Sequence, residues 1–256
     1  EEDCDGLCYQ YILGKSGLKP DYIVLGEATN LDIYRGHRGR MEIQVTTKGV
    51  SCHGSAPERG VNAIYKMTPI IQGIEKLNAK LKSDKFLGKG TIVVTKIECK
   101  TGSINTVPNQ CTIYLDRRLT KGETKQSAVK EIKSVIKHID AEVTVLKYAV
   151  PSYTGYVLPT EKYFPTWVLE ENHPLVQSGV QAATLIRGTK PQISKWIFST
   201  NGIATMGMFK VPTIGFGPGN EVDAHTSTDH IAIEHLKKAA MVYALFPKVL
   251  IAKLNK

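Results

Sequence analysis

The chain has 256 residues, of which 42% are hydrophobic and 22% are charged, and its formal net charge is +9. This balance is typical of a folded globular protein and excludes a disordered or low-complexity chain. No apolar run reaches the ~18–20 residues that cross a bilayer. The acidic start, Glu1-Glu2-Asp3, is the reverse of a positively charged signal peptide. We therefore expect a cytoplasmic protein with no membrane partner.

Five cysteines are scattered along the chain: Cys4, Cys8, Cys52, Cys99 and Cys111. Their odd number and irregular spacing favour a reducing compartment over a disulfide framework. Cys4 and Cys8 lie one helical turn apart, which is a spacing that a metal accepts. Because no second cysteine pair follows at zinc-site spacing, a helix face is the better interpretation.

The start and the end of the chain have the pattern of an α/β layer. Apolar spacing predicts a helix over 3–13 and a buried strand over 21–26, which delivers Glu27 at its carboxyl end. The pattern after residue 150 predicts three further elements: a helix over 174–187, a strand over 214–217 and a closing helix over 229–250. Apolar strands of this kind are typical of sheets covered by helices on both faces.

The middle of the chain has a different pattern, with alternating strands and amphipathic helices. We expect a kink or a late helix start at Pro69. The predicted order is strand 39–47, helix 62–81, strands 91–99 and 111–117, helix 129–139 and strand 142–148. This β-α-β-β-α-β order is the split βαβ, ferredoxin-like arrangement, a four-stranded antiparallel sheet with two helices on one face. We therefore predict an α+β domain over 36–150, inserted into an α/β domain built from 1–35 and 151–256. The outer domain holds too few strands to bury a sheet, so we expect its N-terminal portion to be absent from this chain.

Three places in the chain combine side chains suited to a hydrolytic metal. Glu1 and Glu2 precede the first helix, Glu27 follows the first strand, and His225 follows the strand at 214–217. Carboxylates and neutral imidazoles are standard zinc ligands, and α/β sheets bind ligands at the carboxyl ends of their strands. Taken singly, these residues are explained as well by surface charge, a helix cap and a hydrogen-bonded histidine. Their conjunction predicts a metal site.

Six motifs follow one another as they do in one known family: EEDCDG at 1–6, GEATN at 26–30, GHRGRMEIQVTTKGVSCHGSAPERGVNAI at 36–64, NTVPNQCTIYLDRRL at 105–119, STNG at 199–202 and GFGPGNEVDAHTSTDH at 215–230. On these motifs the sequence resembles metallopeptidase family twenty, which contains aminoacylases, carboxypeptidase G2, acetylornithine deacetylase and succinyl-diaminopimelate desuccinylase. The segment 36–64 is the most specific. Among the subgroups, the sequence is most similar to hydrolases associated with selenium-dependent metabolism.

The resemblance implies a zinc-exopeptidase-like catalytic domain and a set of catalytic roles. Two zinc ions per subunit are expected, with cobalt or manganese as alternatives. Glu2 and His225 match ligands of one zinc, and Glu27 matches a ligand of the second. Glu1 matches the general base. His53 matches a histidine that reaches into the partner subunit's site and stabilises the oxyanion that forms in the transition state.

The resemblance also implies contacts to the substrate. Asn105 and Arg118 match positions that hold the substrate carboxylate, for which a guanidinium fork is suited. Without the family, a turn residue and a surface charge are equally good interpretations of these two. The loop expected to line the pocket is Ser199, Thr200, Asn201 and Gly202. The sequence departs from the family at Asp229, where glutamate is common, and the family's upstream His-x-Asp and bridging Asp are not in this chain.

We therefore expect a homodimer, joined through the inserted domain, that hydrolyses amide bonds in small carboxylate-bearing substrates by metal-activated water. N-acyl amino acid deacylases and dipeptidases are the matching types, and this chain alone is expected to be inactive. The alternative is a non-catalytic or split-gene dimerising scaffold that lacks a complete metal site. A third reading is that the basic inserted domain binds nucleic acid. Its strands lack the stacked aromatics of RNA-binding modules, so we expect no nucleic-acid partner.

Overall fold

The computed structural model describes residues 4–255 and divides the chain into two compact units. An outer unit comprises the chain up to Arg38 and from Thr166 onward, and an inserted unit comprises Gly39–Pro165. The sequence placed the second border at 150 instead. The segment that follows belongs to the inserted unit because β10 (Thr160–Glu161) pairs with β9 (Lys147–Tyr148) and β11 (Tyr163–Phe164) pairs with the start of β3.

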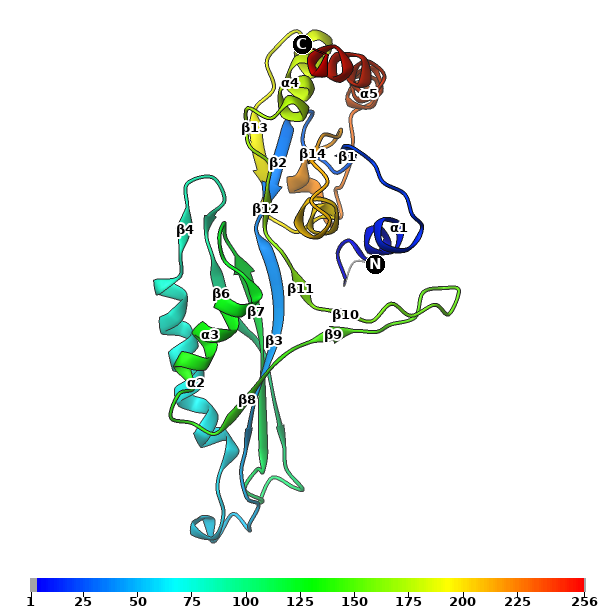
Figure 1. Cartoon of the computed structure of the whole chain (residues 1–256). Coiled ribbons are helices and arrows are strands. Elements are labelled where there is room, and N and C mark those ends of the chain that lie inside the picture. Colours follow the sequence, from blue (N-terminus) through cyan, green and yellow to red (C-terminus); the bar gives the residue numbers. More distant parts are fainter. Residues whose placement is uncertain (1–3, 256) are drawn as a thin grey trace. The chain divides into compact units, whose positions relative to one another are not determined.

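The inserted unit is an antiparallel sheet with two helices on one face (Figure 1). Its remaining elements are β3 (Gly39–Lys48), η1 (Pro57–Arg59), α2 (Ala63–Lys80), β4 (Ser83–Asp84), β5 (Gly88–Lys89), β6 (Thr91–Lys100), β7 (Gln110–Leu119), α3 (Lys125–Val135) and β8 (Ala141–Val145). The strands lie in the order β8-β3-β7-β6. This order confirms the ferredoxin-like arrangement. Alternate strand residues such as Ile43 and Ile113 pack with Met67 of α2 and Ile132 of α3 in one core.

Helix α2 begins at Ala63 and passes through Pro69, so the late start considered from the sequence is not found. The Asn62 side chain accepts hydrogen bonds from the backbone N–H groups of Ile64 and Tyr65, which satisfies donors of the first turn. Proline removes one backbone donor, and the buried side chains along the helix, Met67 among them, compensate by packing against the sheet.

The outer unit is a mixed α/β layer. Its strands are β1 (Ile23–Leu25), β2 (Ile33–His37), β12 (Trp167–Val168), β13 (Ile193–Trp196) and β14 (Thr213–Gly215). Its helices are α1 (Leu7–Lys15), α4 (Pro174–Arg187), the π-helical segment η2 (Ile203–Met208), the short 3-10 turn η3 (Glu221–Asp223) and α5 (Ile233–Leu254). β1 and β13 run parallel to their neighbours β14 and β2, whereas β12 and β14 are antiparallel to β2. Helices α4 and α5 pack against this sheet through one apolar core.

Strand β2 was not predicted, because its five residues IYRGH include an arginine and a histidine, yet every one is buried. The polar members are compensated by hydrogen bonds. Arg35 donates to the Leu169 carbonyl oxygen at 2.8 Å, and both ring nitrogens of His37 are bonded. Between residues 4 and 255, no helix is long and apolar enough to span a membrane.

Candidate metal and substrate site

Two predicted metal ligands are carried by neighbouring loops of the outer unit. β1 and β14 are parallel and in register from Ile23–Thr213 to Leu25–Gly215, so their carboxyl ends lie at the same edge of the sheet. Glu27 lies in the loop after β1, and His225 follows η3 within the connection between β14 and α5. Open α/β sheets bind ligands at such an edge.

Backbone hydrogen bonds tie these two loops together. Leu31 and Asn30 donate from their N–H groups to the carbonyl oxygens of Gly217 and Gly219, at 3.0 and 2.7 Å. The buried Thr29 hydroxyl accepts a hydrogen bond from the Gly217 N–H at 3.0 Å. The positions of the two loops are therefore coupled, because each satisfies polar backbone groups of the other.

Gly217 is required by this close approach. A Cβ atom at this position would lie 2.2 Å from the carbonyl oxygen of Glu27 and 2.7 Å from that of Gly26. Neither contact involves a flexible side-chain end, so any larger residue would push the two loops apart. The glycine therefore controls how near the Glu27 backbone lies to the chain that leads to His225.

His225 has a backbone conformation that is uncommon for a residue with a side chain. Its φ is 63°, in the left-handed region, and the residue is exposed. Between it and β14, the η3 turn is held to β2 by the Tyr34 hydroxyl, which donates to Glu221 Oε1 at 3.3 Å. Burial raises the pKa of the Glu221 carboxyl. Burial and the nearby Glu221 charge raise the pKa of Tyr34 to about 12.

Helix α1 links Glu27 to the predicted substrate loop. The pKa of Tyr9 on this helix is raised by burial and then by the charges of Cys8 and Glu27. At the start of the helix, the Gly6 N–H donates to Asn201 Oδ1 at 2.9 Å. Glu1 and Glu2, the predicted base and zinc ligand, lie outside the described residues.

The loop 199–202 is largely occupied by structural contacts. The N–H of Thr200 donates to His37 Nε2 at 3.0 Å, and Gly202 donates its N–H to the Thr200 hydroxyl at 3.1 Å. A Cβ on Gly202 would lie 2.4 Å from the Trp167 ring. Ser199 differs from these residues. Its hydroxyl is buried and makes no hydrogen bond to the residues that the structure describes, so it is a group of this loop that could bond a ligand.

In the inserted unit, the structure brings His53 and Asn105 together. His53 forms an isolated antiparallel bridge with Thr106, and the Gly54 N–H donates to the Asn105 carbonyl oxygen at 2.6 Å. The Ser55 N–H and hydroxyl lie 3.2 and 2.7 Å from His53 Nδ1. Because a backbone N–H can only donate, Nδ1 is an acceptor and the ring proton is assigned to Nε2. The exposed ring therefore offers an N–H donor.

Arg118 lies at the opposite end of the same sheet. β7 pairs with β3 without interruption from Gln110 to Leu119, and Asn105 precedes β7 whereas Arg118 is near its end. At the usual rise per residue, the eight positions from Gln110 to Arg118 span about 27 Å. The two residues predicted to hold one carboxylate are therefore not brought together within a single inserted unit.

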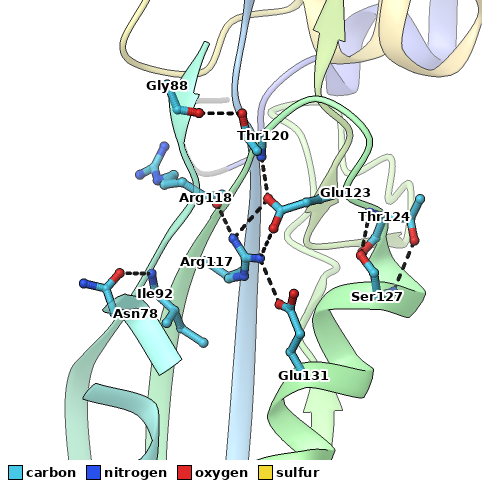
Figure 2. A network of polar contacts seen from close by, with 10 residues as sticks. All are labelled: Asn78, Gly88, Ile92, Arg117, Arg118, Thr120, Glu123, Thr124, Ser127 and Glu131. Carbon is cyan, nitrogen blue, oxygen red and sulfur yellow. Dashed lines mark hydrogen bonds and ion pairs between the residues drawn. The ribbon is translucent and has the colours of Figure 1, made fainter. Parts of the chain in front are cut away.

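The two neighbouring arginines of β7 have different environments. Arg117 is fully buried and bonds Glu123 at 2.6 Å and Glu131 at 3.0 Å (Figure 2). Arg118 is a quarter exposed, and its Nε and Nη2 donate to the two carboxylate oxygens of Asp116 at 2.7 and 2.9 Å. Asp116 thus holds one edge of the Arg118 guanidinium, and the other edge can receive an anion.

The donor types at the outer site suit zinc, since zinc accepts carboxylate oxygen and imidazole nitrogen. From Cys4 to Asn255, no three His, Cys, Asp or Glu residues are grouped closely enough to hold a metal ion. Glu27 and His225 would therefore supply only part of the predicted ligand set, and a tetrahedral site needs further ligands. Sequence reasoning missed His37, Tyr9 and the Tyr34–Glu221 pair, because no local pattern shows which distant residue each one contacts.

Residues 35–144 match the family model described as the peptidase dimerisation domain, M20_dimer. Most of the inserted unit is therefore similar to the M20 peptidase dimerisation domain. The uncharacterized protein YgeY of Escherichia coli K12 is 48% identical over 249 residues, which are 96% of this chain and 62% of that protein. The acetylornithine deacetylase of Buchnera aphidicola is 24% identical over 244 residues, 92% of this chain and 59% of that enzyme. These matches confirm the relationship predicted from the motifs.

Solved structures show the same fold around the M20 dimerisation domain. The M20 family metallo-carboxypeptidase Sso-CP2 of Sulfolobus solfataricus superposes with a TM-score of 0.71 at 17% identity, over 97% of this chain and 68% of that one. The chain spans 59–62% of the length of the two curated relatives named above. The predicted α/β fold class with an inserted dimerisation domain is confirmed.

Proposed function

We propose that the protein carrying this chain is a metal-dependent hydrolase of amide bonds in small, carboxylate-bearing substrates, and that it acts as a cytoplasmic homodimer. One observation carries the proposal: the loops of Glu27 and His225 are tied together at the carboxyl ends of neighbouring parallel strands. The relatives are consistent with it, since one is named a deacetylase and one a metallo-carboxypeptidase.

Glu27 and His225 would hold the metal together with Glu2, and two zinc ions per subunit, with cobalt or manganese as alternatives, are the proposed complement. When bound, such a metal supplies an activated water with a pKa of about 7. Glu1 is the proposed base, which takes a proton from the attacking water and returns it to the leaving amine. The Ser199 hydroxyl is the proposed pocket contact of the loop 199–202.

His53 and Arg118 would act on the substrate from the inserted unit. The Nε2–H of His53 is a donor suited to an oxyanion that forms only in the transition state. The free edge of Arg118 would hold the substrate carboxylate. Because the two lie at opposite ends of the sheet, we propose that a complete site takes Arg118 from one protomer, and His53 with Asn105 from its partner.

The outer edge of β6 offers a place for dimer contact. Within the described sheet β6 pairs only with β7, and its Val93 and Ile97 side chains are 53% and 50% exposed. An exposed strand edge is a template for pairing with another chain. The homodimer is therefore proposed to form through the inserted unit.

The first test measures metal content and turnover on a panel of N-acyl amino acids and dipeptides. We expect bound metal, activity that a chelator removes and zinc restores, and loss of metal in the His225→Ala variant. His230→Ala is the matched control, since His230 is also exposed and bonds only the backbone of Thr228 among the described residues. Unchanged metal content in His225→Ala would overturn its assignment as a ligand, and turnover that survives chelation would overturn the metal dependence. Absence of both bound metal and turnover in the wild type would favour the scaffold.

A mixing experiment tests the shared site. His53→Ala and Arg118→Ala are each expected to be inactive as homodimers. After subunit exchange, half of the dimers are mixed and each mixed dimer has one intact site of two, so about a quarter of the wild-type activity should return. No recovery in the mixture, with exchange verified by mass, would show that both residues serve the same protomer's site.

A further inference from the structure

Two cysteines face each other across the last strand pair of the inserted sheet. Cys99 of β6 and Cys111 of β7 are direct register partners, and their Sγ atoms lie 3.2 Å apart. Both are free thiols, and Cys99 is exposed whereas Cys111 is buried. Neither residue has a role in the proposed hydrolysis.

The backbone geometry accepts a disulfide at this place. Residues paired across antiparallel strands have Cα atoms about 4.5–5.5 Å apart. Disulfides join Cα atoms about 4.4–6.8 Å apart. The bond therefore needs only a closer approach of the two sulfur atoms, because the sheet register already holds Cys99 and Cys111 face to face.

Cys99 and Cys111 lie at the two ends of the connection between β6 and β7, which contacts the chain around His53. Residues 100–110 lie between the two cysteines, and this stretch carries Asn105 and Thr106, which bond the chain around His53. The Val107 N–H also donates to the Cys52 carbonyl oxygen at 2.9 Å. A bond between Cys99 and Cys111 would close a ring around this connection and limit its opening.

We propose that Cys99 and Cys111 form a dithiol site that a small disulfide such as oxidised glutathione converts to an intramolecular disulfide, which clamps the connection 100–110. The disulfide itself is independent of the proposed hydrolase activity. Burial and then the neighbouring Cys99 raise the pKa of the Cys111 thiol to about 12, so Cys99 is the sulfur that meets the oxidant first.

The reaction balances in two exchange steps. The Cys99 thiolate attacks one sulfur of oxidised glutathione, the glutathione disulfide bond breaks, and one glutathione thiolate leaves. Cys111 then attacks the Cys99 sulfur of the mixed disulfide, the bond from Cys99 to glutathione breaks, and the Cys111 proton passes to the departing glutathione sulfur, which leaves as a thiol. Two protein thiols are oxidised and one small disulfide is reduced to two thiols. Cys111 can act while buried because its target is the adjacent Cys99.

The test treats the reduced protein with oxidised glutathione and then counts thiols and maps peptides under non-reducing conditions. The reduced chain has five cysteines, and we expect two fewer thiols after treatment, with a peptide that joins Cys99 to Cys111. Hydrogen exchange at residues 100–110 should slow on oxidation. The Cys99→Ser variant should show neither the thiol loss nor the slower exchange.

Cys52→Ser is the matched control, because Cys52 lies beside the same connection and its thiol donates to the Ala56 carbonyl oxygen at 3.4 Å. It should lose the same two thiols as the wild type. Retention of all five thiols in the wild type, a stable glutathione adduct on Cys99, or a linkage to Cys52 would overturn the disulfide. A disulfide with unchanged exchange at 100–110 would overturn the clamp.

Discussion

The inserted unit and the outer unit support their candidate functional residues in opposite ways. In the inserted unit, His53 is exposed and takes no part in the buried ion pairs of Arg117 that stabilise the sheet. In the outer unit, the hydrogen bonds that fold the loops are the same bonds that position Glu27 and the chain leading to His225. In the inserted unit, a substitution should therefore be able to change stability without moving the candidate functional residue. In the outer unit, a substitution that loosens the loops should lower stability and ligand binding together.

The largest expected effect is on the Arg117 network. Glu123→Ala leaves a guanidinium with 0% exposure without its main carboxylate, which should cost about 3–5 kcal/mol in the free energy of unfolding, measured by urea titration. Glu161→Ala is the control, because its pair with Lys125 is a third to a half exposed and should cost at most about 1 kcal/mol. Equal losses in the two variants would contradict the role given to burial.

The next effect is at the crossing of the two outer loops. Gly217→Ala introduces a methyl group 2.2 Å from the Glu27 carbonyl oxygen, and this overpacking should cost about 2–3 kcal/mol. Bound metal, measured by elemental analysis, should fall with it. Gly102→Ala adds a methyl group with no neighbouring atom within 4 Å and should leave both stability and metal unchanged. Retained metal in Gly217→Ala would show that the loops are coupled less tightly than we infer.

Thr29→Val tests the same coupling by removing one hydroxyl at nearly constant volume. The buried Gly217 N–H loses its acceptor, which should cost about 1–2 kcal/mol. The exposed Thr226, whose hydroxyl donates to the Asp223 carbonyl oxygen, provides the control through Thr226→Val. Thermal and urea unfolding should show that Thr29→Val is less stable than Thr226→Val. Equal stability of the two variants would contradict the inference that Thr29 couples the two loops.

The smallest effect is the pH dependence of the η3 turn. Burial raises the pKa of Glu221 above its ordinary 4.5, so the folded state favours the protonated carboxyl. The resulting stabilisation is complete below that value and is lost as the pH rises through the folded-state pKa. As the pH rises above 4.5, the wild type should therefore lose stability relative to Glu221→Gln. Parallel curves of unfolding free energy against pH for the two proteins would contradict this.

Most elements of the inserted unit were predictable because each carries its own pattern. The alternation in β3 and the apolar faces of α2 and α3 are local, and so is the Asn62 cap. In the outer unit, β2 contains charged residues and β12 has only two residues, so local patterns could not show them. Their places depend on partners that are distant in the chain, such as the Leu169 carbonyl that Arg35 bonds.

The sequence by itself determined that the chain has an α/β part and an inserted α+β part, the order of its motifs and the chemical types of the predicted metal donors. Periodicity and residue type are local properties, so no tertiary contact is needed to recognise them. Only the tertiary structure decided which of these residues meet. The register of β7 separates Asn105 from Arg118 and brings Cys99 next to Cys111. Thr200 and Gly202 are held by contacts with His37 and Trp167 that stabilise the fold. The physical reason is that backbone pairing and close packing join residues far apart in the chain, and no local pattern records those partners.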